Sequence, residues 1–338
     1  MDNKTINKQI RGISNRGSLL LIIFFAVTVL VSLLMGFLSY TGGYGSLWQN
    51  GRFTFTLTTV GLCFLLYPLL LLVYYKCLNR KNGLRLREAF GKSRRSKGWL
   101  FKWTVISIGC SQLVSIIFNF FYEYEGKPFL PSQIEKLLSK NDLYTWIVFA
   151  LYTVVLAPIF EELLFRATIY RNNAPMGQLF AAVVTGITFG LWHTNISQTI
   201  FAAIMGIFLC LIYAKTKSIV TVMLVHSINN LISFLLTFIK IQLGSILSAG
   251  DKEFMIQAMF HTQTVKAVFL TVIILVVFLA CIIGPILLAV QIVKKRKGLG
   301  LSKGIFPYSA PKKALVYFSA PLTVIAFALM IALTFFSA

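Results

Sequence analysis

Two glutamates and an arginine stand in the apolar segment "PIFEELLFRATIY", residues 158 to 170. A charge at the centre of a bilayer costs about 2.5 to 3.5 kcal/mol on insertion scales, so such carboxylates need partners or a wet cavity. Glu162 and Arg166 have the i, i+4 spacing at which a carboxylate and a guanidinium meet on one helix face. Adjacent helical residues point about 100° apart, so Glu161 is expected to lack a partner in its own helix. Pro158 has no amide hydrogen and is expected to kink the helix beside them.

Two of the three histidines lie in the apolar segments that follow. Phe189 and His193 share one helix face in "ITFGLWHTN", and His226 and Asn230 share one in "MLVHSINNLI". Polar groups that are costly individually are tolerated when they line one water-filled cavity. The glutamates, these two histidines and Asn230 are therefore predicted to share a cavity. His261 falls in a predicted outer loop and is expected to be solvated.

These residue types indicate hydrolytic chemistry. A carboxylate and a histidine can polarise a water, while a second histidine and an asparagine amide can donate to a developing oxyanion. The same side chains could instead hold zinc through Glu161, His193 and His226, since two imidazoles and a carboxylate are a common catalytic ligand set. The spacing does not separate these alternatives. The chain has no Gly-x-Ser-x-Gly turn, no His-Glu-x-x-His helix and no pair of intramembrane aspartates.

The three blocks "EELLFR", "FGLWH" and "HSINN", in this order, resemble the CPBP family, also called the Abi family, of CAAX prenyl endopeptidases and bacteriocin-processing enzymes. The family pattern is Glu-Glu-x-x-x-Arg, Phe-x-x-x-His and His-x-x-x-Asn/Asp, and this chain matches it within residues 143–240. The resemblance implies an intramembrane endopeptidase. It would make Glu161 the general base, assisted by His193, and His226 and Asn230 the oxyanion donors. Glu162 and Arg166 would form a supporting pair, and Phe189 would support the site.

The composition predicts an all-α integral membrane protein, a polytopic bundle of eight or nine helices. The 338 residues are 57% hydrophobic, and the mean hydropathy is +0.79. A helix needs about 20 mostly apolar residues to cross a bilayer. The segments that meet this length are 18–40, 53–75, 99–122, 143–170, 177–195, 197–214, 218–239, 266–292 and 314–336. The first is too long for a signal peptide and is expected to be a span.

The depths of the site residues disagree under these boundaries. Glu161 would lie about 27 Å into a span that starts outside at Leu143, whereas His193 would lie about 24 Å from the inner end of the next. The two agree only if the fourth helix is long or kinked at Pro158 and the fifth begins near Ala181.

The net charge of +22 is explained by topology. With a cytoplasmic N-terminus, the basic residues fall in inner loops, nine of them between Lys76 and Lys97, and most acids fall outside. This arrangement predicts a multi-pass cell-membrane protein attracted to anionic lipid at the cytoplasmic face, with no nucleic-acid partner. The oligomeric state is not indicated. The five cysteines lack CxxC spacing and are expected to pack as small apolar residues.

Three regions are expected. Residues 1–142 would hold three spans, a basic loop and an outer helix at "PSQIEKLLSK". This helix would lie either on the membrane surface or packed on the bundle. Residues 143–240 would be the catalytic core, and residues 241–338 would add two spans. The expected substrate is a membrane-associated peptide or protein, such as a lipidated C-terminus, a bacteriocin or pheromone precursor, or a membrane regulator. The alternatives are a non-proteolytic membrane partner or immunity protein of the same fold, and a carrier.

Overall fold

The computed structural model describes residues 2–41, 50–79, 83–124, 132–140, 142–247, 264–294 and 300–336. These residues are helical with no strand among them, apart from one isolated bridge between Phe90 and Ser218. The N-terminal half contains α1 (Asn3–Thr41), α3 (Gly51–Gly61), η1 (Leu62–Leu66), α4 (Tyr67–Leu72), η2 (Val73–Leu78), η3 (Leu86–Ala89), α5 (Lys97–Tyr124) and α6 (Ser132–Leu138). The remainder contains α7 (Leu143–Ala150), η4 (Leu151–Leu156), α8 (Ala157–Leu164), η5 (Phe165–Tyr170), α9 (Arg171–Asn173), η6 (Ala174–Met176), α10 (Gln178–Trp192), α11 (Ile196–Thr216), α12 (Ile219–Leu247), α14 (Thr264–Lys294), α15 (Ala310–Phe318) and α16 (Pro321–Phe336).

The predicted all-α polytopic fold is confirmed, with a smaller number of spans than nine. Seven helical segments of the described chain are long and apolar enough to cross a membrane, or eight if α15 and α16 form one bent span. The fifth predicted span is α10, whose 15 residues reach only about 22 Å. The bend of 84° between α15 and α16 falls at Pro321, which cannot donate a backbone hydrogen bond to the preceding turn.

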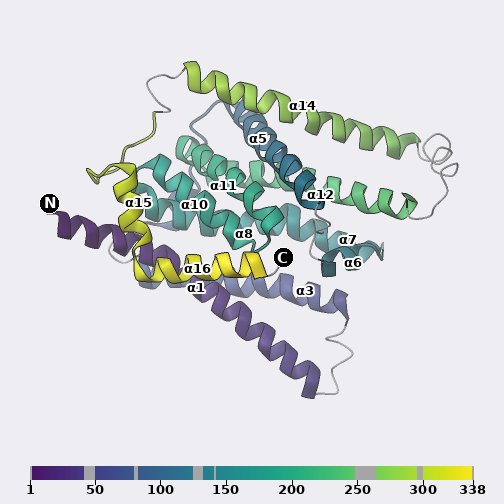
Figure 1. The fold of residues 1–338 in the computed structure, drawn as a ribbon, viewed down its shortest axis with the longest axis horizontal. Helices are drawn as coiled ribbons and strands as arrows, with labels where there is room; N and C mark the ends of the chain where they lie inside the picture. The colour runs from purple at the N-terminus through teal and green to yellow at the C-terminus, as the bar shows by residue number, and fades with distance from the viewer. Residues whose placement is uncertain are drawn as a thin grey trace.

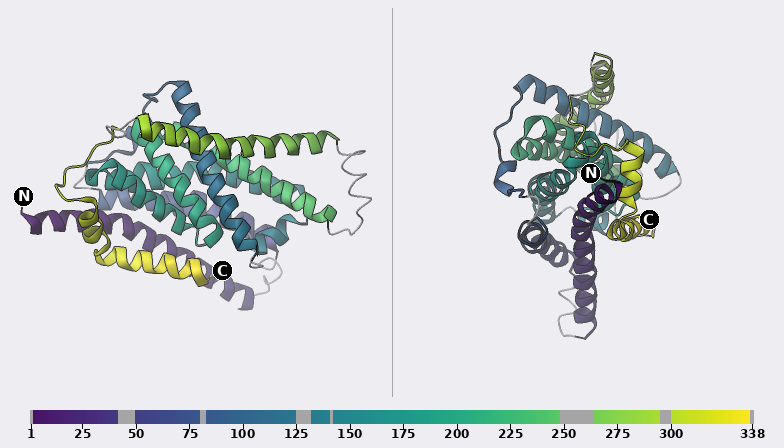
Figure 2. Two further views of the ribbon diagram at one scale, coloured as in Figure 1. Left: turned by 45° about the horizontal axis from the view of Figure 1, so that its top comes forward. Right: turned by 90° about the vertical axis from the view of Figure 1, so that its left-hand side faces the viewer.

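The segment that carries the glutamates lies at the centre of the bundle. Figure 1 shows α8, α10 and α11 between α5 and α14 on one side and α1, α3 and α16 on the other, and the turned view in Figure 2 agrees. Helices α10 and α11 pack closely because glycines meet there: a Cβ on Gly190 would lie 2.3 Å from the Thr199 carbonyl oxygen. This close contact fixes the helix that carries Phe189.

Residues Leu143–Met176 form one continuous helical segment that passes through Pro158. The helix widens to π geometry in η4, immediately before Pro158, and again in η5. Pro158 stands in the first turn of α8 and has no amide hydrogen to donate to the preceding π-turn, so a backbone carbonyl of η4 needs another donor. The fourth span is therefore long, which is one of the conditions under which Glu161 and His193 can lie at the same depth.

Several smaller predictions can be compared with the structure. Helix α6 forms within "PSQIEKLLSK", and Leu137 and Leu138 are buried, which favours packing on the bundle over a surface helix. Four cysteines are buried as expected, Cys77 is exposed, and all five are free. His261 lies outside the described residues.

Candidate active site

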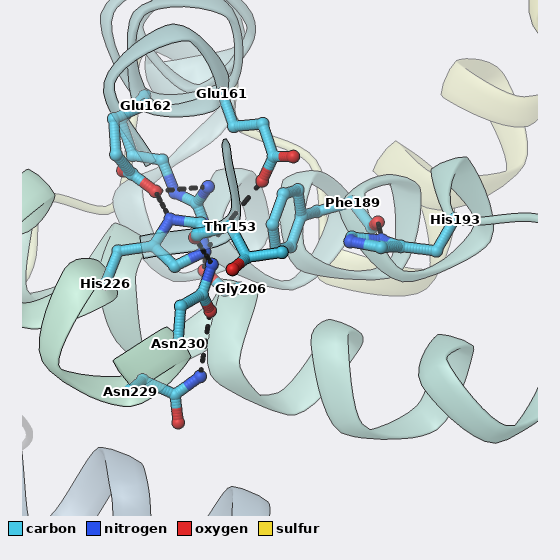
Figure 3. Close-up of polar contacts among 10 residues, drawn as sticks. Thr153, Glu161, Glu162, Phe189, His193, Gly206, His226, Asn229 and Asn230 are labelled. Carbon is cyan, nitrogen blue, oxygen red and sulfur yellow. Dashed lines mark hydrogen bonds and ion pairs between the residues drawn. The ribbon is translucent and has the colours of Figure 1, made fainter. Parts of the chain in front are cut away.

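The predicted site residues come from four neighbouring elements. Glu161 and Glu162 lie on α8, Arg166 lies one turn later in η5, and His226 and Asn230 lie on α12. Phe189 lies near the end of α10, and His193 follows that helix directly. Figure 3 shows the two glutamates directed differently, with Phe189 and His226 nearby.

Glu162 is held by an ion pair and a hydrogen bond, both at the same carboxylate oxygen. Its Oε1 lies 2.8 Å from Nη1 of Arg166 and 2.7 Å from Nδ1 of His226. The carboxylate and the guanidinium are completely buried. The predicted i, i+4 pair is thus confirmed, and His226 is a further partner that spacing did not reveal. A buried charge that loses such a partner is strongly destabilising.

Arg166 is held from two other directions as well. Its Nη2 donates to the backbone carbonyl of Gly206 on α11 at 3.3 Å. Its guanidinium carbon lies 4.4 Å from the centroid of the Phe189 ring, within the range of a cation–π contact. Arg166 therefore joins η5 to α10 and α11 and, through Glu162, to α12.

Glu161 has different surroundings although it is also buried. Its Oε2 lies 3.8 Å from Nε2 of His226, which is beyond hydrogen-bond distance. Among the described residues, no other ion pair or hydrogen bond to this carboxylate is found. Glu161 therefore faces the imidazole edge that Glu162 does not use, as Figure 3 shows.

The hydrogen bonds define the histidine tautomers. Nδ1 of His226 faces a carboxylate, so it carries the hydrogen, and Nε2 is the bare acceptor in the neutral ring. Nδ1 of His193 lies 2.8 Å from the carbonyl oxygen of Phe189, which can only accept, so Nδ1 of His193 also carries its hydrogen. Both imidazoles thus leave Nε2 available for proton transfer.

Glu161 lies beside His226, and the Phe189 ring packs against both His226 and His193. The edge-to-face ring centroid distances from Phe189 are 4.9 Å to His193 and 5.7 Å to His226. Among the described residues, no hydrogen bond or ion pair joins Glu161 to His193. Direct assistance of Glu161 by His193, implied by the family resemblance, is therefore not formed in this conformation.

Glu161 and His193 nevertheless lie at similar depth. Glu161 lies 15 residues before Met176 and His193 lies 15 residues after Gln178, the two residues that flank the turn at Gly177. At 1.5 Å per residue, each lies about 23 Å from that turn. The depth mismatch arose because the fourth span was expected to end at residue 170, whereas its helical segment continues to Met176. Helix α10 begins at Gln178 and not near Ala181.

Asn230 makes a contact that spacing could not predict. Its Nδ2 donates to the backbone carbonyl of Thr153 at 2.8 Å. Thr153 lies in the π-turns of η4, where the carbonyl of Tyr152 accepts from the amide five residues later. The equivalent partner of the Thr153 carbonyl would be Pro158, which has no N–H. Asn230 thus satisfies the carbonyl that Pro158 leaves unpaired, and one of its amide hydrogens remains.

The alternative zinc set does not assemble. Among the described residues, no three His, Cys, Asp or Glu side chains converge as metal ligands. Nδ1 of His226 is engaged by Glu162, and His193 is separated from Glu161 by Phe189. The set of Glu161, His193 and His226 therefore does not fit a metal in this conformation.

The fold and the site define a polytopic membrane protein with a buried glutamate–histidine centre. Residues 143–232 match the family model described as Rce1-like, type II CAAX prenyl endopeptidase Rce1-like. This match confirms the resemblance inferred from the three motifs, and at the level of the family it indicates a CAAX-type intramembrane protease.

The chain is also similar to a bacterial protein over part of its length. The chain is 30% identical over 119 residues to UPF0177 protein YaiH of Lactococcus lactis subsp. lactis (strain IL1403), which covers 34% of this chain and 49% of that protein. The chain thus spans about half the length of the curated relative it matches. No solved structure matches the chain.

Proposed function

We propose that this protein is an intramembrane endopeptidase in which Glu161 activates water. The observation that supports this most is the unequal pairing of two buried carboxylates. Glu162 is neutralised by Arg166, whereas Glu161 meets only the bare edge of His226. A general base needs a carboxylate that is held in place but not committed to a cation.

Charge counting leads to the same assignment. Arg166 and Glu162 cancel, so with a neutral His226 the cluster keeps one negative charge, on Glu161. Taking a proton from water makes the cluster neutral at the moment the hydroxide attacks the peptide carbonyl. The proton can then pass from Glu161 or from Nε2 of His226 to the leaving amine, since the two atoms are 3.8 Å apart.

The oxyanion donors are part of the proposal. Asn230 retains one amide hydrogen after donating to Thr153, and this hydrogen is available to a developing oxyanion. Nε2 of His226 donates only after it has gained a proton, so its contribution follows the first proton transfer. His193 packs against the same Phe189 ring as His226, and we propose that its Nε2 contacts the substrate.

A reaction without a metal is the form that these donors support. Water activation by Glu161 uses contacts already made, whereas a zinc set would require His226 to leave Glu162. We expect full cleavage after chelation and verified metal removal. Loss of cleavage that is recovered on adding zinc would contradict this part of the proposal.

The proposed substrates are peptides or proteins held at the membrane. Candidates are lipidated C-termini, bacteriocin or pheromone precursors, and membrane regulators, because the site lies on membrane-spanning helices. Comparative peptidomics of cells expressing the wild type or Glu161→Ala tests the proposal and identifies the substrate. Cleavage products should disappear in Glu161→Ala at equal protein level. Unchanged peptides and unchanged biological activity would favour a non-proteolytic membrane partner.

A further inference from the structure

A basic cluster surrounds the turn between α11 and α12, far along the chain from the glutamate motif. Lys217 lies in this turn, and the segment 90–94 packs against it. The backbone N–H of Arg94 donates to the Thr216 carbonyl at 3.1 Å, and Phe90 forms a bridge with Ser218. A Cβ on Gly91 would lie 2.9 Å from the Lys217 carbonyl oxygen. Backbone contacts thus hold the two segments together.

The charges in this cluster are of one sign. Burial lowers the pKa of Lys217, and the nearby positive charges of Arg94 and Arg171 lower it further. The acidic residue beside them, Glu88, is paired with Arg171 at 2.5 Å. Within the described chain, no carboxylate pairs with Lys217 or Arg94. The fold therefore holds Lys217 and Arg94 close together without a carboxylate of the described chain to neutralise them, while Arg171 is already paired with Glu88.

Lys217 also has an unusual backbone. Its φ of 58° lies in the left-handed region, where glycine or asparagine is easier to accommodate than a long side chain. A lysine at this position places a half-buried ammonium at the turn, at a conformational cost that a neutral, less strained residue would avoid. An anion bound there would offset the repulsion between the like charges.

The depth of the turn indicates the source of that anion. Lys217 lies between the ends of two spans, Gln198–Thr216 and Ile219–Ile239, which places it at the headgroup level. Phe90 is 49% exposed beside it, and exposed aromatic rings are typical of membrane interfaces. Phosphate is the abundant anion at this depth.

We propose that Arg94 and Lys217 bind the phosphate of an anionic membrane lipid, beside the positive charge of Arg171. The site is separate from the glutamate–histidine centre, so it does not depend on the protein being a protease. Each basic residue near an anionic surface strengthens binding about fivefold. A headgroup bound here would hold the segment 90–94 against the turn that begins α12, the helix of His226.

Lipid titration of the purified full-length protein tests this site. The thermal unfolding midpoint is measured in neutral detergent while phosphatidylglycerol or phosphatidylcholine is added. Lys217→Asn removes the charge and suits the left-handed backbone, and Arg94→Gln removes a second, exposed charge. Lys4→Asn is the matched control, because Lys4 is exposed on α1 and distant from the turn in sequence.

The expected result is stabilisation of the wild type by phosphatidylglycerol beyond that by phosphatidylcholine. Lys217→Asn and Arg94→Gln should each weaken the apparent affinity for phosphatidylglycerol about fivefold, with Lys4→Asn near the wild type. Equal responses of all four proteins would overturn the site. If inorganic phosphate gives the same stabilisation and the same variant pattern, the lipid assignment is wrong and the ligand is a soluble anion. The midpoints without lipid show that each variant is folded.

Discussion

Glu161 and Glu162 are adjacent and both buried, yet their partners differ. Glu162 binds Arg166 and His226 through one oxygen, and Glu161 faces the other nitrogen of His226. The difference arises because consecutive helical residues point in different directions. At this scale the sequence predicted the Glu162–Arg166 pair, since spacing within one helix is sufficient. It could not predict the contacts of His226, because these depend on how α12 packs on α8.

Glu162→Gln should destabilise the protein by about 3 to 5 kcal/mol, because it leaves the buried guanidinium of Arg166 without a counter-charge. The free energy of unfolding in detergent measures this loss. Glu88→Gln is the control: it breaks the exposed contact with Arg171 and should change stability little. An unchanged unfolding free energy for Glu162→Gln would show that the buried pair does not hold the helices together.

At the element scale, Asn230 on α12 supplies the hydrogen bond that Pro158 on α8 cannot donate. The π-turns of η4 keep the fourth span continuous, and the amide of Asn230 satisfies the carbonyl of Thr153. The sequence predicted freed backbone groups near Pro158 but not their partner. A proline indicates which donor is missing, whereas the replacement donor depends on tertiary packing.

A double-mutant cycle tests this arrangement. Asn230→Ala should cost about 1 to 3 kcal/mol, because the Thr153 carbonyl loses its donor. In a Pro158→Ala background the new backbone N–H can supply that hydrogen bond, so Asn230→Ala should cost less there. Unfolding free energies of the four proteins give the coupling energy, expected in the range of about 0.5 to 3 kcal/mol. Strictly additive costs would contradict the assignment.

Helix α7 begins at an acidic cap that responds to pH. Hydrogen bonds from the side chain and backbone of Thr145, with Arg52 nearby at 3.1 Å, hold the pKa of Asp142 below its usual 3.8. A depressed folded-state pKa means that this stabilisation is present above pH 3.8 and is lost as the pH falls through the folded value. Amide exchange in the first turn of α7 should increase over that interval. Asp142→Asn keeps a capping oxygen and should lack this pH dependence; if it has the same one, another group is responsible.

At the scale of the whole molecule, the fold class was predictable because apolar segments of about 20 residues directly indicate membrane-spanning helices. The number of spans was not, since α10 is apolar enough but too short, and α15 and α16 form a bent pair. The similar depth of Glu161 and His193 also became clear only with the actual turn at Gly177. Boundaries between consecutive helices are set by packing, which composition does not record.

The cysteines provide a test of orientation. Cys77 is exposed near the end of the second span, and the other four are buried. With a cytoplasmic N-terminus, a membrane-impermeant maleimide should label Cys77 in permeabilised cells and leave intact cells unlabelled. Cys77→Ser should remove the labelling. Efficient labelling of Cys77 in intact cells would reverse the predicted topology.

The central claim is that Glu161 performs the chemistry while Glu162 maintains the structure. The most direct measurement compares cleavage of an identified substrate by purified wild type and Glu161→Gln, with unfolding measured on the same samples. We predict a loss of about 10² to 10⁴ in rate at unchanged or higher stability, because Glu161 supports no buried cation. A Glu161→Gln protein that is folded and cleaves at the rate of the wild type would contradict the account.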